Sequence, residues 1–348
     1  MKKRFLRLIQ LAAIGLTLGL TVSGVEARKK SCEPVILAYV TSGTTIPVDP
    51  TVVTHINYAF GTVKPTFDGV NIQRPEYLRQ IVQLKEQNPD LRVLLSIGGW
   101  GAGGFSEMAS NDTLRAAFVR DCRQIVRDFR LDGIDLDWEY PGSSASGIAS
   151  APEDVDNFTR LMGELRKALG KKKLLTFASA ASAQHVDFPA VMPYVDFVNL
   201  MCYDMGRPSY GMHHSALYPS PRARWSIDQS VAAHREAGVP DQKIVVGVPF
   251  YAHANTRLGY SDFVSYTQAT TIFPGARYVV DTVAGVPYVE DSTGQMLCVY
   301  DDPRSLRLKC RYVQQNGLRG VMYWEYASDD QQGSLRRAVY DAMRSDEE

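Results

Sequence analysis

Three carboxylic acids alternate with apolar residues in one short segment. The segment reads Leu131-Asp-Gly-Ile-Asp-Leu-Asp-Trp-Glu-Tyr-Pro-Gly142, and its alternating acids are Asp135, Asp137 and Glu139. Because every second side chain of a β-strand points to the same face, we expect these acids to share one face of a strand over 133–139. The opposite face would carry Ile134, Leu136, Trp138 and Tyr140.

Crowded carboxylates are suited to acid catalysis. Burial and mutual repulsion raise the pKa of such groups, so that one of them stays protonated near neutral pH and can donate its proton to a substrate. A calcium or magnesium site is an alternative, but few further oxygen ligands stand nearby. A solvated edge strand is another, but the intervening Ile, Leu and Trp need cover. The pattern favours a catalytic site.

The acids need a scaffold, and the sequence offers a repeated strand and helix pattern. The strand candidates are continuous and apolar, as in strands covered on both faces. They are 35–40, 55–60, 92–98, 133–139, 174–180, 196–203, 244–250 and 319–324.

Amphipathic helix candidates lie between these strands. They span 111–129, 152–169, 226–237, 303–315 and 332–343. Asn111 and Asp112 are the expected caps of the first, and Ser150 precedes the second. The alternation predicts a single (β/α)8 TIM barrel of class α/β, with chemistry at the carboxyl ends of its strands. An open doubly wound sheet is the alternative, but no Gly-rich phosphate turn follows the first strand.

One connection is longer than a barrel requires. About fifty residues (252–302) separate the seventh strand from the helix at Pro303, and they are rich in Tyr, Thr, Val and Gly with turn signals. We expect a small β-rich insertion on the barrel rim.

Composition excludes several classes of protein. The 348 residues include 38 basic and 38 acidic side chains and 45% hydrophobic residues. A disordered chain would be less apolar, a polytopic membrane protein would show several runs of ~20 apolar residues, and a nucleic-acid binder usually carries a basic excess. We predict a globular protein with no nucleic-acid partner.

The N-terminus resembles a targeting segment. Basic residues 2–7 precede an apolar run over 8–22 and the small-residue site Val25-Glu26-Ala27, which is the order of a cleaved signal peptide. We expect residues 1–27 to be removed, 28–348 to form the exported catalytic barrel in the periplasm or medium, and no membrane span to remain. An uncleaved anchor is the alternative, and lipid anchoring at Cys32 is disfavoured by Lys29 and Lys30.

Cysteine and histidine spacing does not predict a metal site. Five cysteines occur at irregular intervals, and two states stay open: a Cys298–Cys310 disulfide, or thiols that are all reduced. The adjacent pair His213-His214 cannot easily chelate one ion from a regular element, so we expect it in a surface loop. We predict neither a metal nor a cofactor.

The acidic segment also resembles a known family. Asp132-Gly-Ile-Asp-Leu-Asp-Trp-Glu-Tyr-Pro141 is similar to the signature of the family 18 glycoside hydrolases, the chitinases and their relatives. Further motifs of that family resemble Ser96-Ile-Gly-Gly-Trp100, Asn199-Leu-Met-Cys-Tyr-Asp204, Gly247-Val-Pro-Phe-Tyr251 and Gly320-Val-Met-Tyr-Trp-Glu325. The resemblance runs in order from Val35 to about Asp329.

The resemblance implies a retaining, substrate-assisted hydrolysis. Glu139 would protonate the glycosidic oxygen, and the 2-acetamido oxygen of the substrate would attack the anomeric carbon. Asp137 would orient the acetamide and balance its developing positive charge, while Asp135 would share a proton with Asp137. Tyr203 would hydrogen-bond the acetamide oxygen, and Asp204 would support the distorted sugar.

Aromatic residues in the same motifs are the expected sugar-binding surface. Trp324 would form the floor beneath the cleaved sugar, because a flat indole fits the C–H face of a hexose. By the same resemblance, the pocket would also include Tyr39, Phe60, Trp100, Met201 and Tyr251.

The substrate implied by the family contains N-acetylglucosamine. The first expectation is cleavage of β-1,4 bonds in chitin or chito-oligosaccharides, and the second is an endo-β-N-acetylglucosaminidase acting on N-glycan cores. Loop aromatic residues favour a linear, chitin-like chain; these are Trp100, Tyr210, Tyr260, Phe263 and Tyr266. A catalytically silent lectin is disfavoured because Glu139 is present.

Overall fold

Eight parallel strands close into a barrel in the computed structural model, which describes residues 33–345. Neighbouring strands follow one another in chain order, and the first strand also pairs with the last. The strands are β1 (Val35–Thr41), β2 (His55–Val63), β4 (Arg92–Gly98), β5 (Gly133–Asp137), β6 (Leu174–Ala180), β7 (Phe197–Met201), β8 (Ile244–Pro249) and β14 (Gly320–Trp324). The predicted TIM barrel is therefore confirmed. A short strand, β3 (Val70–Ile72), lies antiparallel to β2.

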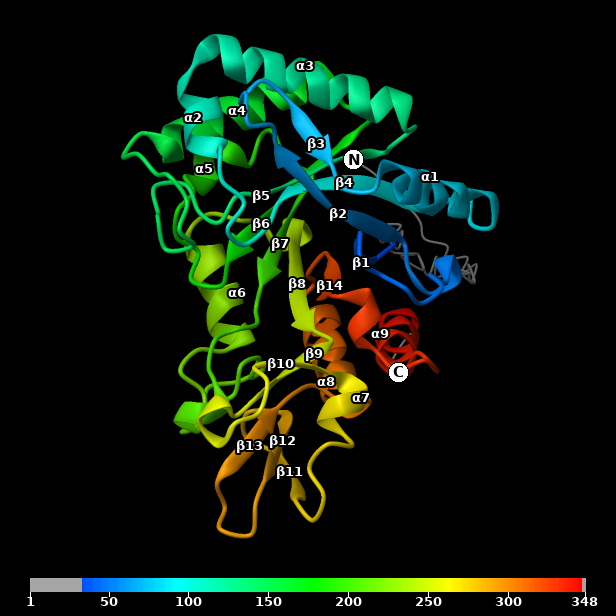
Figure 1. Ribbon diagram of the computed structural model, residues 1–348, viewed down its shortest axis with the longest axis vertical. Coiled ribbons are helices and arrows are strands. Elements are labelled where there is room, and N and C mark those ends of the chain that lie inside the picture. The colour runs from blue at the N-terminus through cyan, green and yellow to red at the C-terminus, as the bar shows by residue number, and fades with distance from the viewer. Residues whose placement is uncertain (1–32, 346–348) are drawn as a thin grey trace, which may run out of the picture. The chain divides into compact units, whose positions relative to one another are not determined.

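Helices surround the barrel (Figure 1). Those that the sequence predicts are α3 (Asp112–Asp128), α4 (Asp154–Leu169), α6 (Ile227–Glu236), α8 (Pro303–Gln315) and α9 (Ser334–Arg344). Asn111 caps α3 by accepting from the N–H groups of Thr113 and Leu114. Further helices that the sequence did not predict are α1 (Pro75–Gln83), α2 (Phe105–Ser110) and α5 (Phe188–Val191).

Strand alternation divides the barrel core into two layers. On β1, Ile36, Ala38 and Val40 pack outward with the helices. Val35, Leu37 and Tyr39 face the interior instead, where they join Phe197 and Met322 in a separate cluster. The barrel interior is thus filled by side chains, and chemistry is confined to its rim.

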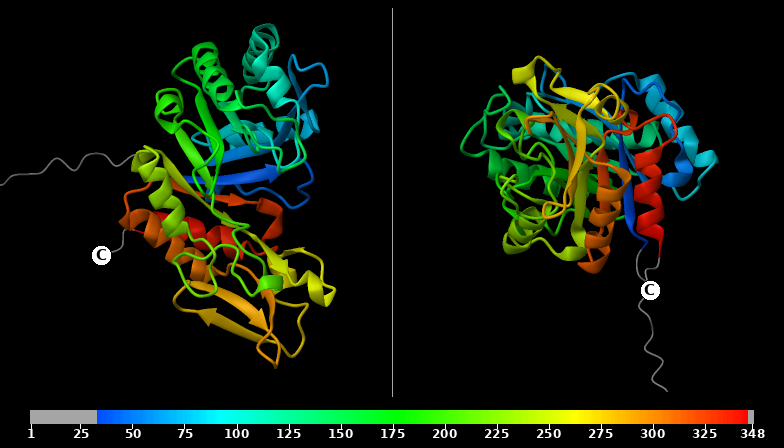
Figure 2. Two further views of the ribbon diagram at one scale, coloured as in Figure 1. Left: turned by 90° about the vertical axis from the view of Figure 1, so that its left-hand side faces the viewer. Right: turned by 90° about the horizontal axis from the view of Figure 1, so that it is seen from below.

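The insertion between β8 and α8 is a second, antiparallel sheet, as predicted. Its strand order is β10-β9-β13-β12-β11. The strands are β9 (Tyr251–Ala254), β10 (Phe263–Ser265), β11 (Arg277–Asp281), β12 (Val286–Glu290) and β13 (Met296–Val299), with the short helix α7 (Tyr266–Ala269) after β10. In the left view of Figure 2 the yellow and orange segments of this insertion lie together, with the orange strands at the lower end of the molecule.

The possible Cys298–Cys310 disulfide is absent, because both thiols are free and buried. Cys298 on β13 packs in the core of the insertion, whereas Cys310 on α8 packs in the outer barrel core. The two side chains belong to different hydrophobic clusters and cannot meet. Cys32 and the expected signal peptide lie outside the described residues.

No helix within residues 33–345 has the length and apolar character needed to cross a bilayer.

Candidate active site

Strand β5 directs its acids into the barrel, as the alternation predicts. Asp135 and Asp137 are 0% and 5% exposed, and Glu139 just beyond the strand is 8% exposed. Ile134, Leu136 and Trp138 pack outward in the helix-facing core. The expectation for Tyr140 was wrong: its side chain lines the pocket at the barrel rim. Because the regular strand ends at Asp137, its two-residue period does not extend to Tyr140.

Asp135 lies at the bottom of the site and is fully hydrogen-bonded. Its Oδ2 accepts from the hydroxyls of Tyr39 at 2.9 Å and Ser96 at 2.8 Å. Its Oδ1 accepts from the hydroxyl of Thr176 at 2.6 Å and the amide of Asn199 at 3.1 Å. Burial raises the pKa of Asp135, and these four hydrogen bonds oppose that rise.

Asp137 has a different environment. Within the described chain, its buried Oδ1 has no hydrogen-bond partner. Burial, together with the charges of Glu139 and Asp135, holds the pKa of Asp137 well above its ordinary value. Gly98 is required beside it: φ is 127°, and a Cβ there would lie 2.0 Å from the carbonyl oxygen of Asp137.

Glu139 has the properties of a general acid. Burial and the nearby charge of Asp204 raise its pKa to about 7, although a hydrogen bond from Tyr140 opposes the rise. A carboxyl group with a pKa near neutrality can both donate and accept a proton during turnover. Its side chain lines the pocket beside Asp137.

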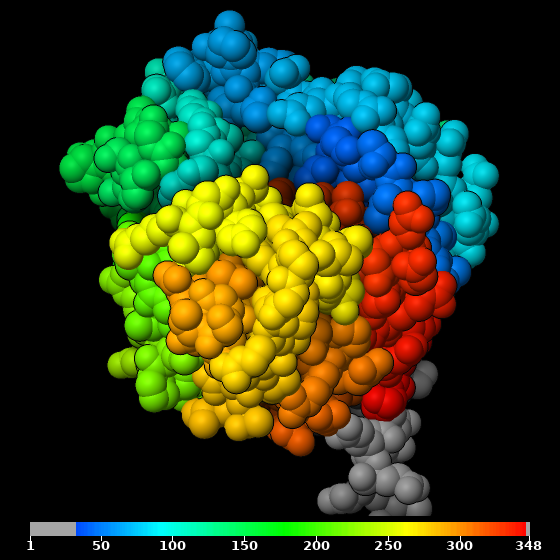
Figure 3. Space-filling model, turned by 60° about the horizontal axis from the view of Figure 1, so that its bottom comes forward, coloured from blue at the N-terminus to red at the C-terminus, as the bar shows by residue number. Residues whose placement is uncertain are grey.

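A pocket of about 790 Å³ opens over these acids, a volume typical of small-ligand sites. Figure 3 shows a hollow between the yellow surface of the insertion and the blue N-terminal strands. The lining residues are Phe60, Trp100, Asp137, Glu139, Tyr140, Met201, Tyr203, Asp204, Arg207, Tyr251, Phe263 and Trp324. The structure therefore brings together most of the predicted site residues.

Two of the predicted residues do not line the pocket. Asp135 and Tyr39 are at most 1% exposed and lie beneath it. The ring of Tyr39 packs against Trp324, with ring centroids 5.6 Å apart. Phe60 stacks on Trp324 at 5.5 Å. The indole of Trp324 is thus supported by Tyr39 and Phe60.

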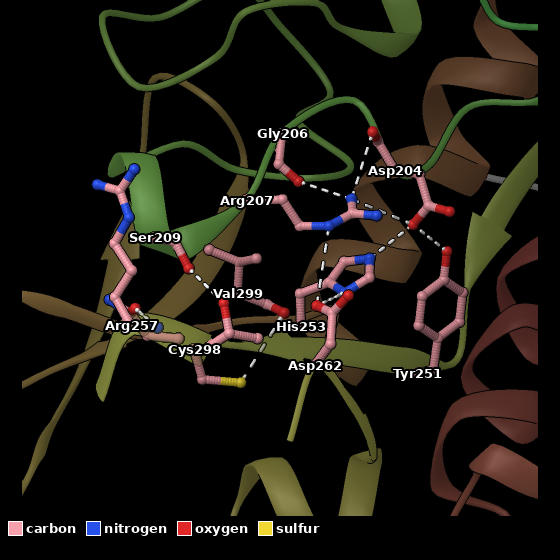
Figure 4. Close-up of polar contacts among 12 residues, drawn as sticks. Asp204, Gly206, Arg207, Ser209, Tyr251, His253, Arg257, Asp262, Cys298 and Val299 are labelled. Atoms are coloured by element: carbon pink, nitrogen blue, oxygen red, sulfur yellow. Dashed lines mark hydrogen bonds and ion pairs between the residues drawn. The ribbon is translucent and has the colours of Figure 1, made fainter. Parts of the chain in front are cut away.

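Asp204, at the carboxyl end of β7, is held by residues of the insertion (Figure 4). Its Oδ1 accepts from the Tyr251 hydroxyl at 2.6 Å and lies 2.6 Å from Nε2 of His253. Burial would raise the pKa of Asp204, but the hydrogen bonds and charges of His253, Tyr251 and Arg207 together lower it.

Asp204, His214 and His253 place one potential ligand atom each within 4.8 Å of one another. The contacts are those of a hydrogen-bonded network, because Asp204 and His253 bond each other and the guanidinium of Arg207 lies 3.5 Å from Asp204. A second cation would meet repulsion there. We therefore assign no metal to this group.

The expected surface position of the histidine pair was wrong. His213 and His214 are each 1% exposed. Nε2 of His213 lies 3.0 Å from Asp281 of the insertion, and the ring of His214 packs edge-on against Tyr251 and His253. The insertion buries a loop that would be exposed on a bare barrel.

Four residues of the site were not predicted from the sequence: Tyr140, Arg207, Phe263 and His253. Strand alternation pointed Tyr140 away, and Arg207 lies in an irregular loop. Phe263 stood out only as a loop aromatic residue. His253 precedes Asp262 by nine residues, and this spacing does not predict a contact. The two side chains meet because β9 and β10 pair.

Three comparisons identify relatives of this chain. A model of the glycosyl hydrolases family 18 matches residues 35–329. A class V chitinase of Arabidopsis thaliana is 30% identical, and the alignment covers 84% of each protein. Chitinase A1 of Niallia circulans is 29% identical over 81% of this chain, which spans 54% of that protein. An N-acetylglucosaminidase of family 18 from Paenibacillus barengoltzii has a TM-score of 0.80 at 36% identity, covering 89% of this chain and 99% of that one.

The sequence match and the structural match cover the same barrel. The match spans all eight barrel strands, and the buried acids of β5 lie at the carboxyl rim, where barrel enzymes carry out their chemistry. The chain therefore belongs to family 18 of the glycoside hydrolases and is a chitinase-like hydrolase.

Proposed function

We propose that this chain hydrolyses β-1,4 bonds next to N-acetylglucosamine in chito-oligosaccharides, with retention of configuration and participation of the substrate's acetamide. The observation that carries this proposal is the unpartnered, buried Oδ1 of Asp137. A buried acceptor without a donor is costly, and the N–H of an acetamide on the sugar would supply the missing donor.

The remaining roles follow from the pocket. Glu139 protonates the leaving oxygen, since its pKa is raised to about 7 by burial. The acetamide oxygen attacks the anomeric carbon and gives a cyclic oxazolinium, whose positive charge the carboxylate of Asp137 balances. Tyr203 and Asp204 line the same pocket, where Tyr203 would hydrogen-bond the acetamide oxygen and Asp204 would support the distorted sugar. Water then opens the ring, with Glu139 acting as the base.

The aromatic lining supports a short sugar chain as substrate. Trp324 lies at the pocket wall and presents an apolar ring to a sugar, and Trp100 at the rim is 66% exposed. A volume of about 790 Å³ is in the range of small-molecule sites. The Paenibacillus relative is named as an N-acetylglucosaminidase, which supports a substrate that contains N-acetylglucosamine.

The decisive variant is Glu139→Gln, which keeps the size of the side chain but cannot donate an acidic proton. We expect it to lose at least ~10²-fold in kcat on a 4-methylumbelliferyl chitobioside while binding of chitotriose by calorimetry persists. Unchanged turnover would overturn the assignment of Glu139.

A thiazoline analogue of the cyclic intermediate should inhibit the wild type competitively. Products from chitohexaose and from a high-mannose glycopeptide, measured side by side, separate the chitin and N-glycan substrates.

We also propose that the chain is exported. The support is the sequence of residues 1–27 alone, with its basic start, apolar run and small-residue site. Expression of the full chain in a bacterial host should yield a periplasmic or extracellular product whose N-terminal residue is Arg28. A product that stays in the cytoplasm and begins at Met1 would contradict this proposal.

A further inference from the structure

His253 contacts a carboxylate with each of its two ring nitrogens. Nε2 lies 2.6 Å from Oδ1 of Asp204, and Nδ1 lies 2.7 Å from Oδ1 of Asp262. The histidine side chain is 0% exposed, whereas the two acids are 42% and 39% exposed. Figure 4 shows the imidazole lying between the two carboxylates.

The two contacts determine how many protons the His253 ring carries. Ionised carboxylates only accept hydrogen bonds, and a neutral imidazole donates through one nitrogen only. With a neutral ring, one nitrogen lone pair would face a carboxylate oxygen at hydrogen-bonding distance and would repel it. Both contacts are attractive when the ring carries a proton on each nitrogen.

The surrounding groups are compatible with that cation. The guanidinium of Arg207 lies 3.5 Å from Asp204 and 3.8 Å from Asp262, so two carboxylates face two cations and the cluster is neutral. Tyr251 donates its hydroxyl to Asp204. The ring of His214, 5.0 Å from that of His253, is uncharged because burial holds its pKa well below the ordinary value.

One further cation lies in the neighbourhood of His214. The charge of Lys309 contributes to the lowered pKa of His214. Lys309 is itself paired with Asp301 at 2.6 Å, and both side chains are fully buried. The charge of Lys309 is therefore compensated locally by Asp301, whereas Asp204 and Asp262 contact the His253 ring directly.

We propose that His253 and Asp262 are positioning residues for the hydrolysis: a doubly protonated imidazole bridges the two acids and holds the Asp204 carboxylate at the pocket wall. This inference rests on the proposed function, in which Asp204 supports the sugar. The imidazole and the Tyr251 hydroxyl both engage Oδ1 of Asp204, which leaves Oδ2 for the substrate.

The bridge gives the insertion a part in the chemistry. His253 lies on β9 and Asp262 directly precedes β10, and the two strands pair with His253 opposite Phe263. Phe263 lines the pocket and packs edge-on against the His253 ring at 4.8 Å. The barrel supplies Asp204, and the insertion orients it.

The variant Asp262→Asn tests the charge separately from packing and hydrogen bonding. Asparagine keeps the size of the side chain and an oxygen acceptor for Nδ1, but it no longer favours the second proton on the ring. We expect kcat on the chitobioside reporter to fall about tenfold with KM changed less than about twofold, and Asp262→Glu to restore a substantial part of kcat. Wild-type kcat in Asp262→Asn would overturn the proposal.

A matched control is available in the same chain. Asp281→Asn makes the same change next to another buried histidine, His213, whose Nε2 lies 3.0 Å from Asp281. Neither residue lines the pocket. We expect kcat in this variant to stay at the wild-type value. An equal loss in both variants would show that the effect is a general one of the insertion and would overturn the proposed role of Asp262.

A spectroscopic measurement tests the bridge without any turnover. The ¹⁵N shifts of the histidine rings in the full chain at pH 7, assigned with His253→Asn, should show both nitrogens of His253 protonated. Asp262→Asn should convert one of them to the unprotonated type. A neutral His253 ring in the wild type would overturn the proposal. If the wild type cleaves no N-acetylglucosamine substrate, the proposed function fails whatever the spectrum shows.

Discussion

Asp135 and Asp137 lie two residues apart on one face of β5, yet their carboxylates are in opposite hydrogen-bonding states. Asp135 accepts hydrogen bonds from four side chains, whereas the buried Oδ1 of Asp137 has no partner within residues 33–345. The protein satisfies the lower acid completely, whereas the upper acid keeps an unpartnered oxygen, which the proposed function assigns to the substrate acetamide.

Replacing Asp137 by asparagine should separate stability from activity. The change removes the carboxyl group that can ionise to balance the developing oxazolinium, so we expect kcat on the chitobioside reporter to fall by at least ~10²-fold. Thermal unfolding should occur at the wild-type temperature or above it, because a neutral amide costs less to bury beside Asp135 and Glu139 than an ionisable carboxyl group does. A lowered Tm together with near-wild-type kcat would contradict the role given to Asp137.

The control for this variant lies at the start of the same strand. Asp132 accepts from the N–H of Val93 at 2.8 Å and forms an ion pair with Lys85, and it does not line the pocket. We expect Asp132→Asn to reduce the free energy of unfolding by about 1 kcal/mol and to leave kcat unchanged.

The pH profile should report the protonation of Glu139. Burial raises its pKa to about 7, so the acid is protonated below that pH and ionised above it. Because the reaction needs a proton donor, kcat/KM should fall as the pH rises through about 7. This alkaline limb of the pH profile reports the titration of the Asp137–Glu139 pair, because the two acids interact. Activity already lost by pH 5.5 would indicate a Glu139 of ordinary pKa.

Trp100 should contribute to the binding of longer substrates. Its side chain is 66% exposed, and its ring lies 6.5 Å from that of Tyr140 at the pocket rim. We expect Trp100→Ala to raise KM for chitohexaose severalfold, with a smaller change for the chitobioside reporter and no change in Tm. The matched control is Tyr278→Ala, which removes an exposed aromatic ring on β11 outside the pocket and should leave both KM values unchanged.

The ion pair of Lys309 and Asp301 should be important for stability. Both side chains are 0% exposed, and the nitrogen lies 2.6 Å from the carboxylate. We expect Asp301→Ala to cost about 3–5 kcal/mol in the free energy of unfolding, because it leaves an uncompensated buried ammonium group.

The comparison pair is Arg235–Asp241. Nε of Arg235 lies 2.6 Å from Oδ1 of Asp241, and the two side chains are 37% and 36% exposed. Removal of the acid in Asp241→Ala should cost about 0–1 kcal/mol, since water screens an exposed pair. Urea unfolding of both variants measures the contrast. Equal losses in the free energy of unfolding would mean that the Lys309 ammonium group becomes hydrated in the Asp301 variant.

The sequence by itself determined the barrel, the insertion and the acidic strand. Continuous apolar strands alternating with capped helices leave few other topologies, and a two-residue period is enough to direct Asp135, Asp137 and Glu139 inward. These are local properties, because each depends on neighbours within one element. The same reasoning failed at Tyr140, one residue after Glu139, since the period holds only while the strand is regular.

Only the tertiary structure decided which side chains meet. Asp204 and Arg207 lie in the loop after β7, His253 lies on β9 and Asp262 directly precedes β10. No spacing along the chain therefore predicts their contact. The burial of His213 and His214 and the separation of Cys298 from Cys310 have the same origin. Hydrogen bonds and packing between distant segments depend on where the two sheets place those segments. Composition and periodicity do not predict that placement.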